Sequence, residues 1–310
     1  MHALLAIQRI LARIERELDQ PLSLDALARA AGMSRWHFLR TFSAMVGEPP
    51  ARYIRRRRLS EAARILRESP RTILDVALAF QFESHEAFTR AFKTEVGLTP
   101  REWRAGIRCT VPPVLPFPPV SLDASALNSR FARTSMNPEF IQLPAAVFAG
   151  LETRFTPVLS PKSDNLQVIP ALWQRFLSRL GDVCPREPGI THGLCKLPES
   201  GKQVEARADE LLYLASVEID PCAPPPQGMV TWRTPGGLHA KFVHRGPIAG
   251  IGETMGAIYG GWFPSSGYTR GEGPDIERYD ARFHPTRSDS VLELYVPIRK
   301  VTGAAPRPGH

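Results

Sequence analysis

The chain has 310 residues, a formal net charge of +8 and 43% hydrophobic residues. This length suits two domains of about 100 to 200 residues each. The sequence has no run of about 18 apolar residues, which argues against a membrane-spanning helix. Its first 18 residues carry charges throughout, unlike a secretory signal peptide. We therefore expect a cytoplasmic protein without a membrane partner.

The excess positive charge lies in the N-terminal third. Residues 1–108 hold 19 basic and 12 acidic side chains, whereas the remaining 202 residues hold 20 and 19. A polyanionic partner would therefore bind the N-terminal part. The four cysteines are too far apart in sequence for a typical zinc motif, so we expect no metal site, cofactor or disulfide framework. They are Cys109, Cys184, Cys195 and Cys222.

Composition divides the chain into four segments. Residues 1–108 are rich in Ala, Leu and Arg with helical periodicity, and residues 109–137 contain five prolines followed by a polar stretch. From about residue 140, short β-like runs alternate with two helical stretches. We predict an all-α domain over 1–108, a proline-rich linker over 109–137, an α+β domain over 138–302 and a disordered tail over 303–310.

The N-terminal segment repeats itself at a displacement of 50 residues. So many matched positions indicate one supersecondary unit that occurs twice. The matches include Ser34 with Ser84, Phe38 with Phe88, Arg40 with Arg90, Phe42 with Phe92, Gly47 with Gly97 and Tyr53 with Trp103.

Each unit is predicted to be a helix-turn-helix. A serine can cap the second helix of each unit and a glycine can end it. Within that helix, two phenylalanines at i and i+4 form an apolar stripe that faces the core, so the opposite face points outward. A tryptophan and an arginine one turn apart suit contact with thymine methyls and with guanine or phosphate. The candidate DNA-binding residues are Ser34, Arg35, Trp36 and Arg40 in the first unit and Ser84, His85, Glu86 and Arg90 in the second.

A third helix is predicted between the units, over residues 51–69. At 1.5 Å per residue it would be about 28 Å long. It could therefore hold two recognition helices about one DNA turn, roughly 34 Å, apart. Arg55, Arg56, Arg57 and Arg58 are too many for one helix face, so we expect some to be solvated or paired and at least one, with Arg55 as the candidate, to contact phosphate.

These residues resemble the AraC/XylS family of transcription regulators. The matching strings are SRWHFLRTF, YIRRRRLSEAARIL and ILDVALAFQFESHEAFTRAFKTEVGLTPREWR. The resemblance to the Rob-like subgroup implies that Trp36 and Arg40 enter one major groove and that Arg90 helps to read the next. That subgroup often has glutamines where this chain has His85 and Glu86, so the resemblance does not imply the sequence preference of the second half-site. Double-stranded DNA is the expected partner, with RNA polymerase as a further candidate.

The second domain resembles the GyrI-like effector-binding fold, which is built from two βαββ units. The two helical stretches, about 165–180 and 248–262, agree with that arrangement. The matching strings are LWQRFLSRLG, ELLYLASVEI, MVTWRTPGGLHAKFVHRGPIAGIGETMGAIYGGWFPSSGY, PDIERYDARF and SVLELYVPIRK. The resemblance implies a small-molecule effector.

Strand alternation places an acid beside a tyrosine in two of these runs. Glu277 and Tyr279 share one face of their strand, and Glu293 and Tyr295 share one face of theirs. A carboxylate among aromatic rings suits a cationic or amphipathic aromatic ligand. By resemblance, Glu277 is the central pocket acid, with Glu293 and Tyr295 as secondary candidates. Further aromatic residues either line the pocket or form core, namely Trp173, Phe176, Tyr213 and Trp262.

Several alternatives remain open. Glu277, and more readily Glu293, could be a surface strand acid in a salt bridge with an arginine. Some GyrI-like domains are hydrolases, so Glu277 could instead activate a water molecule. The domain could also bind a regulatory protein. We expect a ligand-responsive transcription regulator with no catalytic residues, because the helix-turn-helix repeat favours that function.

Overall fold

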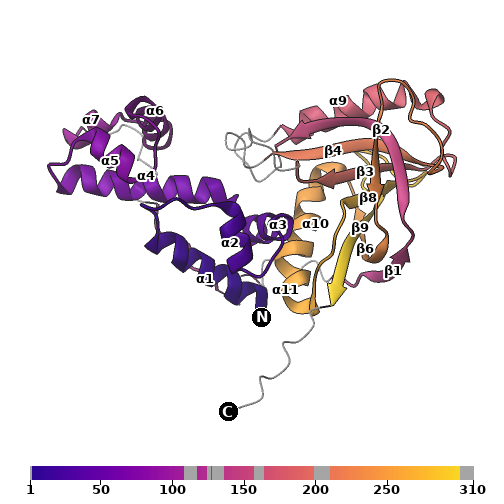
Figure 1. Cartoon of the computed structure of the whole chain (residues 1–310), viewed down its shortest axis with the longest axis horizontal. Coiled ribbons are helices and arrows are strands. Elements are labelled where there is room, and N and C mark those ends of the chain that lie inside the picture. Colours follow the sequence, from indigo (N-terminus) through magenta and orange to yellow (C-terminus); the bar gives the residue numbers. More distant parts are fainter. Residues whose placement is uncertain are drawn as a thin grey trace, which may run out of the picture.

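A computed structural model describes residues 2–107, 117–123, 127, 136–156, 164–198 and 210–300. The predicted tail 303–310, Cys109 and most of the predicted linker lie outside these residues. Figure 1 shows a helical unit on one side and, in contact with it, a sheet unit on the other. Within the described ranges, no helix is both long enough and apolar enough to cross a membrane.

The N-terminal unit consists of helices. They are α1 (His2–Arg16), α2 (Leu24–Ala30), α3 (Arg35–Val46), α4 (Pro50–Glu68), α5 (Ile73–Ala79), α6 (His85–Val96) and α7 (Pro100–Arg104). The predicted all-α class is confirmed.

The 50-residue repeat is present in the structure as two matching helix-turn-helix units. α3 and α6 are each 12 residues long and begin 50 residues apart. The Ser34 hydroxyl accepts a hydrogen bond from the His37 amide, and the Ser84 hydroxyl accepts one from the Ala87 amide. Gly47 and Gly97 end the two helices in the left-handed region, with φ of 89° and 81°. Sequence and structure therefore agree on both recognition helices.

The phenylalanine stripes form the core of this unit, as predicted. Phe38, Phe42, Phe88 and Phe92 are fully buried in one hydrophobic cluster. Trp103 closes the second unit by donating a hydrogen bond from Nε1 to the Ala63 carbonyl oxygen, at 2.9 Å. The faces of α3 and α6 opposite these phenylalanines therefore point away from the helical core.

Part of the predicted linker packs on the helical unit. The amide of Val120 donates to the Tyr53 hydroxyl at 3.2 Å, and the Gln8 side chain donates to the Leu122 carbonyl oxygen at 2.8 Å. Leu122 is itself buried in the helical core. Residues 117–123 are thus held on the N-terminal helical unit by hydrogen bonds and apolar burial.

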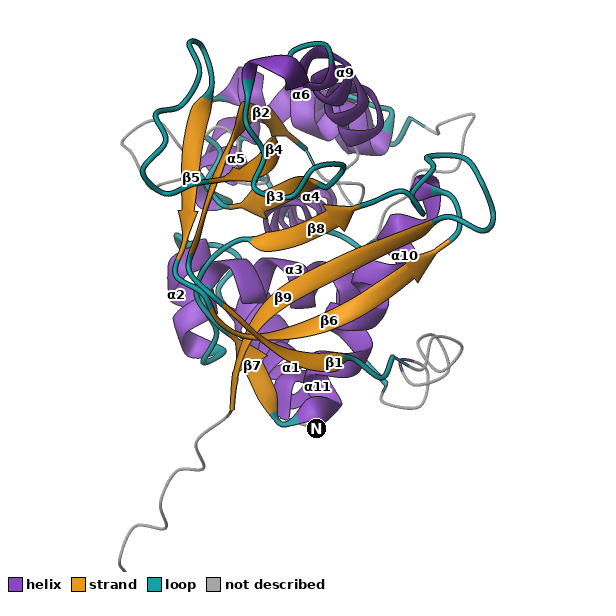
Figure 2. Ribbon diagram, turned by 90° about the vertical axis from the view of Figure 1, so that its right-hand side faces the viewer, coloured by secondary structure: helices purple, strands orange, loops and turns teal. Residues whose placement is uncertain are grey.

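The C-terminal unit is one antiparallel sheet with helices packed against it (Figure 2). The strands run in the order β1-β6-β9-β8-β3-β4-β2-β5, and β7 pairs with β9. Their bounds are β1 (Glu139–Leu143), β2 (Ala146–Phe155), β3 (Thr191–Lys196), β4 (Leu211–Ile219), β5 (Val230–Thr234), β6 (Gly237–Arg245), β7 (Tyr268–Arg270), β8 (Asp275–Tyr279) and β9 (Val291–Lys300).

Two βαββ units are recognisable, as the resemblance to the GyrI-like fold implies. The first is β2, α9 (Asn165–Leu177), β3 and β4. The second is β6, a helical segment, β8 and β9; that segment comprises η3 (Ile248–Gly250), α10 (Ile251–Gly256), the π-helical turn η4 (Ala257–Trp262) and α11 (Phe263–Ser266). β3 and β8 pair at the centre and join the units.

The chain exchanges strands between these two units. β1 precedes the first unit but pairs with β6, and β5 precedes the second but pairs with β2. The two connections pass closely at Gly236, which has φ of 72° and where a Cβ atom would lie 2.6 Å from the Ala145 nitrogen. A side chain there would clash with backbone, so this crossing requires glycine.

Candidate functional site

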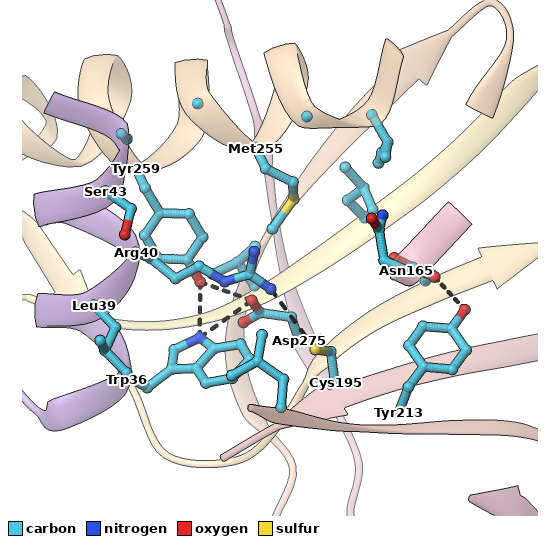
Figure 3. Close-up of a pocket in the computed structure, with 18 of the residues that line it drawn as sticks. Trp36, Leu39, Arg40, Ser43, Asn165, Cys195, Tyr213, Met255, Tyr259 and Asp275 are labelled. Atoms are coloured by element: carbon cyan, nitrogen blue, oxygen red, sulfur yellow. Dashed lines mark hydrogen bonds between the residues drawn. The ribbon is translucent and has the colours of Figure 1, made fainter. Parts of the chain in front are cut away.

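A cavity of about 140 Å³ lies where the sheet, α10 and η4 meet α3 (Figure 3). Its walls come from both units of the chain. The sheet contributes Cys195, Tyr213, Asp275 and Glu277; the helical segment contributes Met255 and Tyr259; and α3 contributes Trp36, Leu39, Arg40 and Ser43.

Glu277 lies in an aromatic cluster on the inner face of β8. Its Oε2 accepts hydrogen bonds from the hydroxyls of Tyr213 and Tyr279, at 2.5 and 2.6 Å. Trp173 donates from Nε1 to the Tyr213 hydroxyl at 3.2 Å, and its ring lies 5.0 Å from that of Tyr279. Burial raises the pKa of Glu277, although these hydrogen bonds oppose the rise. The predicted pairing of Glu277 with Tyr279 on one strand face is present in the structure.

Gly193 on β3 makes room for this cluster. A Cβ atom at this position would lie 2.0 Å from the Tyr213 hydroxyl oxygen and 2.6 Å from Glu277 Oε2. Since β3 lies between the strands that carry these two residues, their side chains meet across Gly193. Any larger residue would separate the acid from the tyrosine.

A second buried acid, Asp275, was not predicted. It forms an ion pair with Arg270, with 2.9 Å between Nη2 and Oδ1, and its Oδ2 accepts a hydrogen bond from the Tyr259 hydroxyl at 2.8 Å. The signal was available, because Asp275 is two residues before Glu277 and alternation places both on one strand face. Tyr259 could not have been found this way, since it comes from the π-helical turn η4.

Two of the predicted DNA-binding side chains lie inside this cavity. Trp36 is 5% exposed, and its Nε1 donates to Tyr259 Oη and Asp275 Oδ2, each at 3.2 Å. The Arg40 guanidinium lies 4.7 Å from the centre of the Trp36 ring and 3.7 Å from Cys195 Sγ. The expectation that these residues face solvent is wrong. They do point away from the helical core, but the second domain covers that face.

The second recognition helix, α6, is accessible to solvent. His85, Glu86 and Arg90 are exposed on α6, while Ser84 caps it. In the first unit Ser34 is exposed and Arg35 is partly buried, with its Nε 3.8 Å from Asp25. The structure therefore gathers the α6 candidates on one accessible helix and separates them from Trp36 and Arg40.

The four consecutive arginines of α4 have different environments, as expected. Arg55 is exposed. Arg56 contacts Glu48 and lies 3.8 Å above the ring of Phe117. Arg57 is buried in an ion pair with Glu15 at 2.7 Å. Arg58 donates to the carbonyl oxygens of Leu18 and Gln20. Arg55 is therefore the member of this group with a side chain turned to solvent.

Glu293 is not part of the cavity. Antiparallel pairing sets Arg278 opposite Glu293 and Glu277 opposite Leu294, so Glu293 lies on the other sheet face from Glu277. There it contacts Arg282 at 2.9 Å and accepts a hydrogen bond from the Tyr295 hydroxyl at 2.8 Å. The prediction of Glu293 as a pocket acid is wrong, and the salt-bridge alternative is the one observed.

The other aromatic candidates divide between the cavity and the core. Tyr213 belongs to the Glu277 cluster, and Trp173 supports it from α9. Tyr295 borders the cavity, but its hydroxyl is directed to Glu293. Trp262 packs against Phe242 and Tyr268, at ring distances of 5.1 and 6.1 Å, and is a core residue. Its assignment to the pocket is not supported by these contacts.

Comparisons with known proteins match both units. Residues 27–106 match a helix-turn-helix domain model, and residues 136–299 match the GyrI-like small molecule binding domain. The Right origin-binding protein of Escherichia coli (strain K12) is 32% identical over 95% of this chain and 98% of its own length. The transcriptional regulator Rob of Salmonella typhimurium is 30% identical over the same shares. A solved AraC-type regulator from Chromobacterium violaceum is 30% identical over 32% of this chain and 89% of its own, with a TM-score of 0.31.

Proposed function

The chain belongs to the Rob-like, AraC-type DNA-binding transcription regulators that carry a GyrI-like small molecule binding domain, and we propose that its cavity binds a cationic or amphipathic aromatic compound. The ligand would lie against Tyr213, Glu277 and Tyr279, with Trp173 behind them.

The observation that carries this proposal is the carboxylate of Glu277 held by two tyrosine hydroxyls in a largely apolar cavity. A buried carboxylate without a counter-ion is costly. A ligand cation would offset that cost by charge attraction, and the surrounding rings would add cation–π contact and apolar burial. A neutral or anionic ligand would gain no such charge attraction.

For the DNA site, we propose that α3 and α6 enter successive major grooves. Arg40, with Trp36, would contact bases from the first helix, and Arg90 from the second, while Arg55 would hold a phosphate. The full proposed set is Ser34, Arg35, Trp36, Arg40, Arg55, Ser84, His85, Glu86 and Arg90. RNA polymerase is a further proposed partner and the cytoplasm the proposed location, since a promoter-bound regulator acts there on the polymerase.

Hydrolysis of a reactive small molecule is the second candidate function. It is favoured by the raised pKa of Glu277, because a carboxylate with a higher pKa is a better general base near neutral pH. Incubating the full chain with aryl esters separates the two candidates. Ester turnover by the wild type that Glu277→Gln abolishes would support hydrolysis. A wild type that binds ligand but turns over no ester would support a sensor.

The ligand proposal is tested on the full chain with tetraphenylphosphonium and tetraphenylborate, a cation and an anion of matched shape. Glu277→Gln keeps the side-chain shape and removes the charge. We expect calorimetry to show that the variant binds the cation at least about tenfold more weakly than the wild type, a difference of about 1.4 kcal/mol. The variant should bind the anion no more weakly than the wild type does. Equal weakening of both would indicate a collapsed pocket, and an unchanged affinity for the cation would contradict recognition by Glu277.

A further inference from the structure

The cavity already contains an aromatic ring and a cation, and both belong to the DNA-binding helix α3. Nine of the twelve α3 residues are buried, against four of the twelve in its repeat partner α6. The phenylalanines are buried in both helices, and most of the difference comes from α3 residues that pack on the second domain, such as Trp36 and Ala44. α3 packs on η4 and α10 (Figures 1 and 3).

This contact and DNA binding by α3 exclude each other. The major groove is about 12 Å wide, and a helix with its side chains has a diameter of about 10 to 12 Å. A helix in the groove must present its outward face to the bases. On α3 that face carries Trp36 and Arg40, whose side chains here contact Asp275, Tyr259 and Cys195.

The contact also restricts the space for a small molecule. With α3 in place the cavity measures about 140 Å³, whereas pockets for drug-sized ligands measure roughly 300 to 1,000 Å³. Trp36 and Arg40 line this space directly. A ligand of ordinary size must therefore displace their side chains to reach the Glu277 cluster.

The chemistry of this internal occupant matches that of the proposed ligand. An indole donates to the Asp275 carboxylate while a guanidinium stacks on the indole and lies close enough to Glu277 to favour its ionised form. A cationic aromatic compound would satisfy the same acids and rings.

The occupant is held incompletely. Arg40 Nε and His37 Nε2 are buried without a hydrogen-bond partner among the described residues, and Arg40 Nη2 makes a long contact of 3.7 Å to the sulfur of Cys195. Buried polar groups in this condition are costly, and release into water or onto DNA phosphates would relieve the cost. This cost lowers the stability of the closed arrangement relative to an open one.

We infer that α3 is an internal ligand of the effector cavity, which Trp36 and Arg40 occupy in the closed chain and leave when a small molecule or DNA binds. The inference rests on the proposed function of the cavity. Small molecule and DNA both bind the open chain, so each raises the affinity of the other by the same factor. The effector is then an inducer of DNA binding.

The first test uses the internal repeat as its own control. Trp36→Ala with Arg40→Ala removes the internal occupant, and Glu86→Ala with Arg90→Ala changes the same two positions of α6. We expect the α3 variant of the full chain to bind tetraphenylphosphonium at least about tenfold more tightly than the wild type, because no fraction of the chain is closed by its own side chains. The α6 variant should bind it as the wild type does. Arg40→Ala alone should show a smaller gain, which guards against misfolding of the double variant. Equal or weaker binding by both α3 variants would overturn the inference.

The second test does not depend on the ligand. Cys195 is buried beneath Arg40, whereas Cys184 and Cys222 are exposed. Excess duplex DNA, selected in vitro for binding by the full chain, should accelerate alkylation of Cys195 by N-ethylmaleimide at least about tenfold, with Cys184 and Cys222 as references in the same digest. An unchanged rate at Cys195 would overturn the inference. If no variant binds tetraphenylphosphonium, the proposed ligand class is wrong, and the alkylation rate alone decides whether α3 closes the cavity.

Discussion

α3 and α6 are two copies of one helix with different surroundings. They share their length, their serine caps, their terminal glycines and their buried phenylalanines. Yet Arg90 is exposed on α6, whereas its counterpart Arg40 lies in the cavity of the second domain. The repeat determines which face points away from the helical core, but not whether that face meets solvent, DNA or another domain.

The difference suggests a division of labour within one DNA-binding domain. α6 is accessible in the closed chain and could make a first, weak contact with DNA. α3 can follow only after it leaves the sheet domain. Specific binding would then require opening, and opening is the step that a small molecule can bias.

The largest expected effect tests whether both helices bind together. Inserting about 5 base pairs, half a DNA turn, between the two contacted segments should lower specific affinity at least about 100-fold, or about 2.7 kcal/mol, because α3 and α6 would face opposite sides of the duplex. Fluorescence anisotropy with the two duplexes measures this. Unchanged affinity would mean that one helix alone engages the bases.

The next largest effect is the loss of DNA affinity when either of the matched arginines, Arg90 or Arg40, is replaced. Arg90→Ala should weaken binding to the selected site by about 1 to 3 kcal/mol and relax selectivity there. Arg40→Ala loses a similar base contact but also loses a closing contact, so its net effect on affinity should be smaller. Titrations of each variant with specific and random duplexes measure its affinity and its selectivity. A larger loss for Arg40→Ala, or an equal loss on both duplexes, would argue against a sequestered base-reading Arg40.

A pH effect should follow from His37, which faces the second domain beside Phe263 and Thr269. Burial is the largest of the causes that lower its pKa from 6.5 to about 4; Arg270 and Arg299 also lower it, and Asp275 opposes them. Tyr259 also faces its ring. Since the open chain would have the ordinary value, protons bind the open form preferentially, and closure weakens as pH falls below 6.5.

DNA affinity should therefore rise by roughly tenfold, or 1.4 kcal/mol, between pH 7.5 and 5.5. The change is measured relative to His37→Gln, which has no proton to gain at this position and keeps every other histidine of the chain. The same pH profile in both proteins would show that His37 does not report opening.

The smallest expected effect is the loss of DNA affinity when Arg55, the proposed phosphate contact, is replaced. Arg55→Ala should weaken specific and random duplexes alike by a few-fold and reduce the slope of log affinity against log salt by about 1. The neighbouring Arg57→Ala is the contrast, because it breaks a buried ion pair with Glu15 and should lower the melting temperature instead. An Arg55→Ala variant that lost affinity for one sequence only would contradict a phosphate contact.

Much of the fold was predictable because it is written in local patterns. The repeat, the caps at Ser34 and Ser84 and the phenylalanine stripes depend on residues within a turn or two of one another, and the structure has all of them. The pairing of Glu277 with Tyr279 was predictable for the same reason, since a strand places alternate residues on one face.

The sequence by itself therefore determined the two helix-turn-helix units and the acid–tyrosine pairs within single strands, and its resemblance to the GyrI-like fold implied the two βαββ units. Tertiary structure decided which pairs meet: the register of β8 against β9 sends Glu277 into the cavity and Glu293 to the opposite face. It also decided that Trp36 and Arg40 are covered, because contact between domains far apart in sequence has no local signature. Alternation fixes faces within an element, whereas long-range packing fixes which faces are shared.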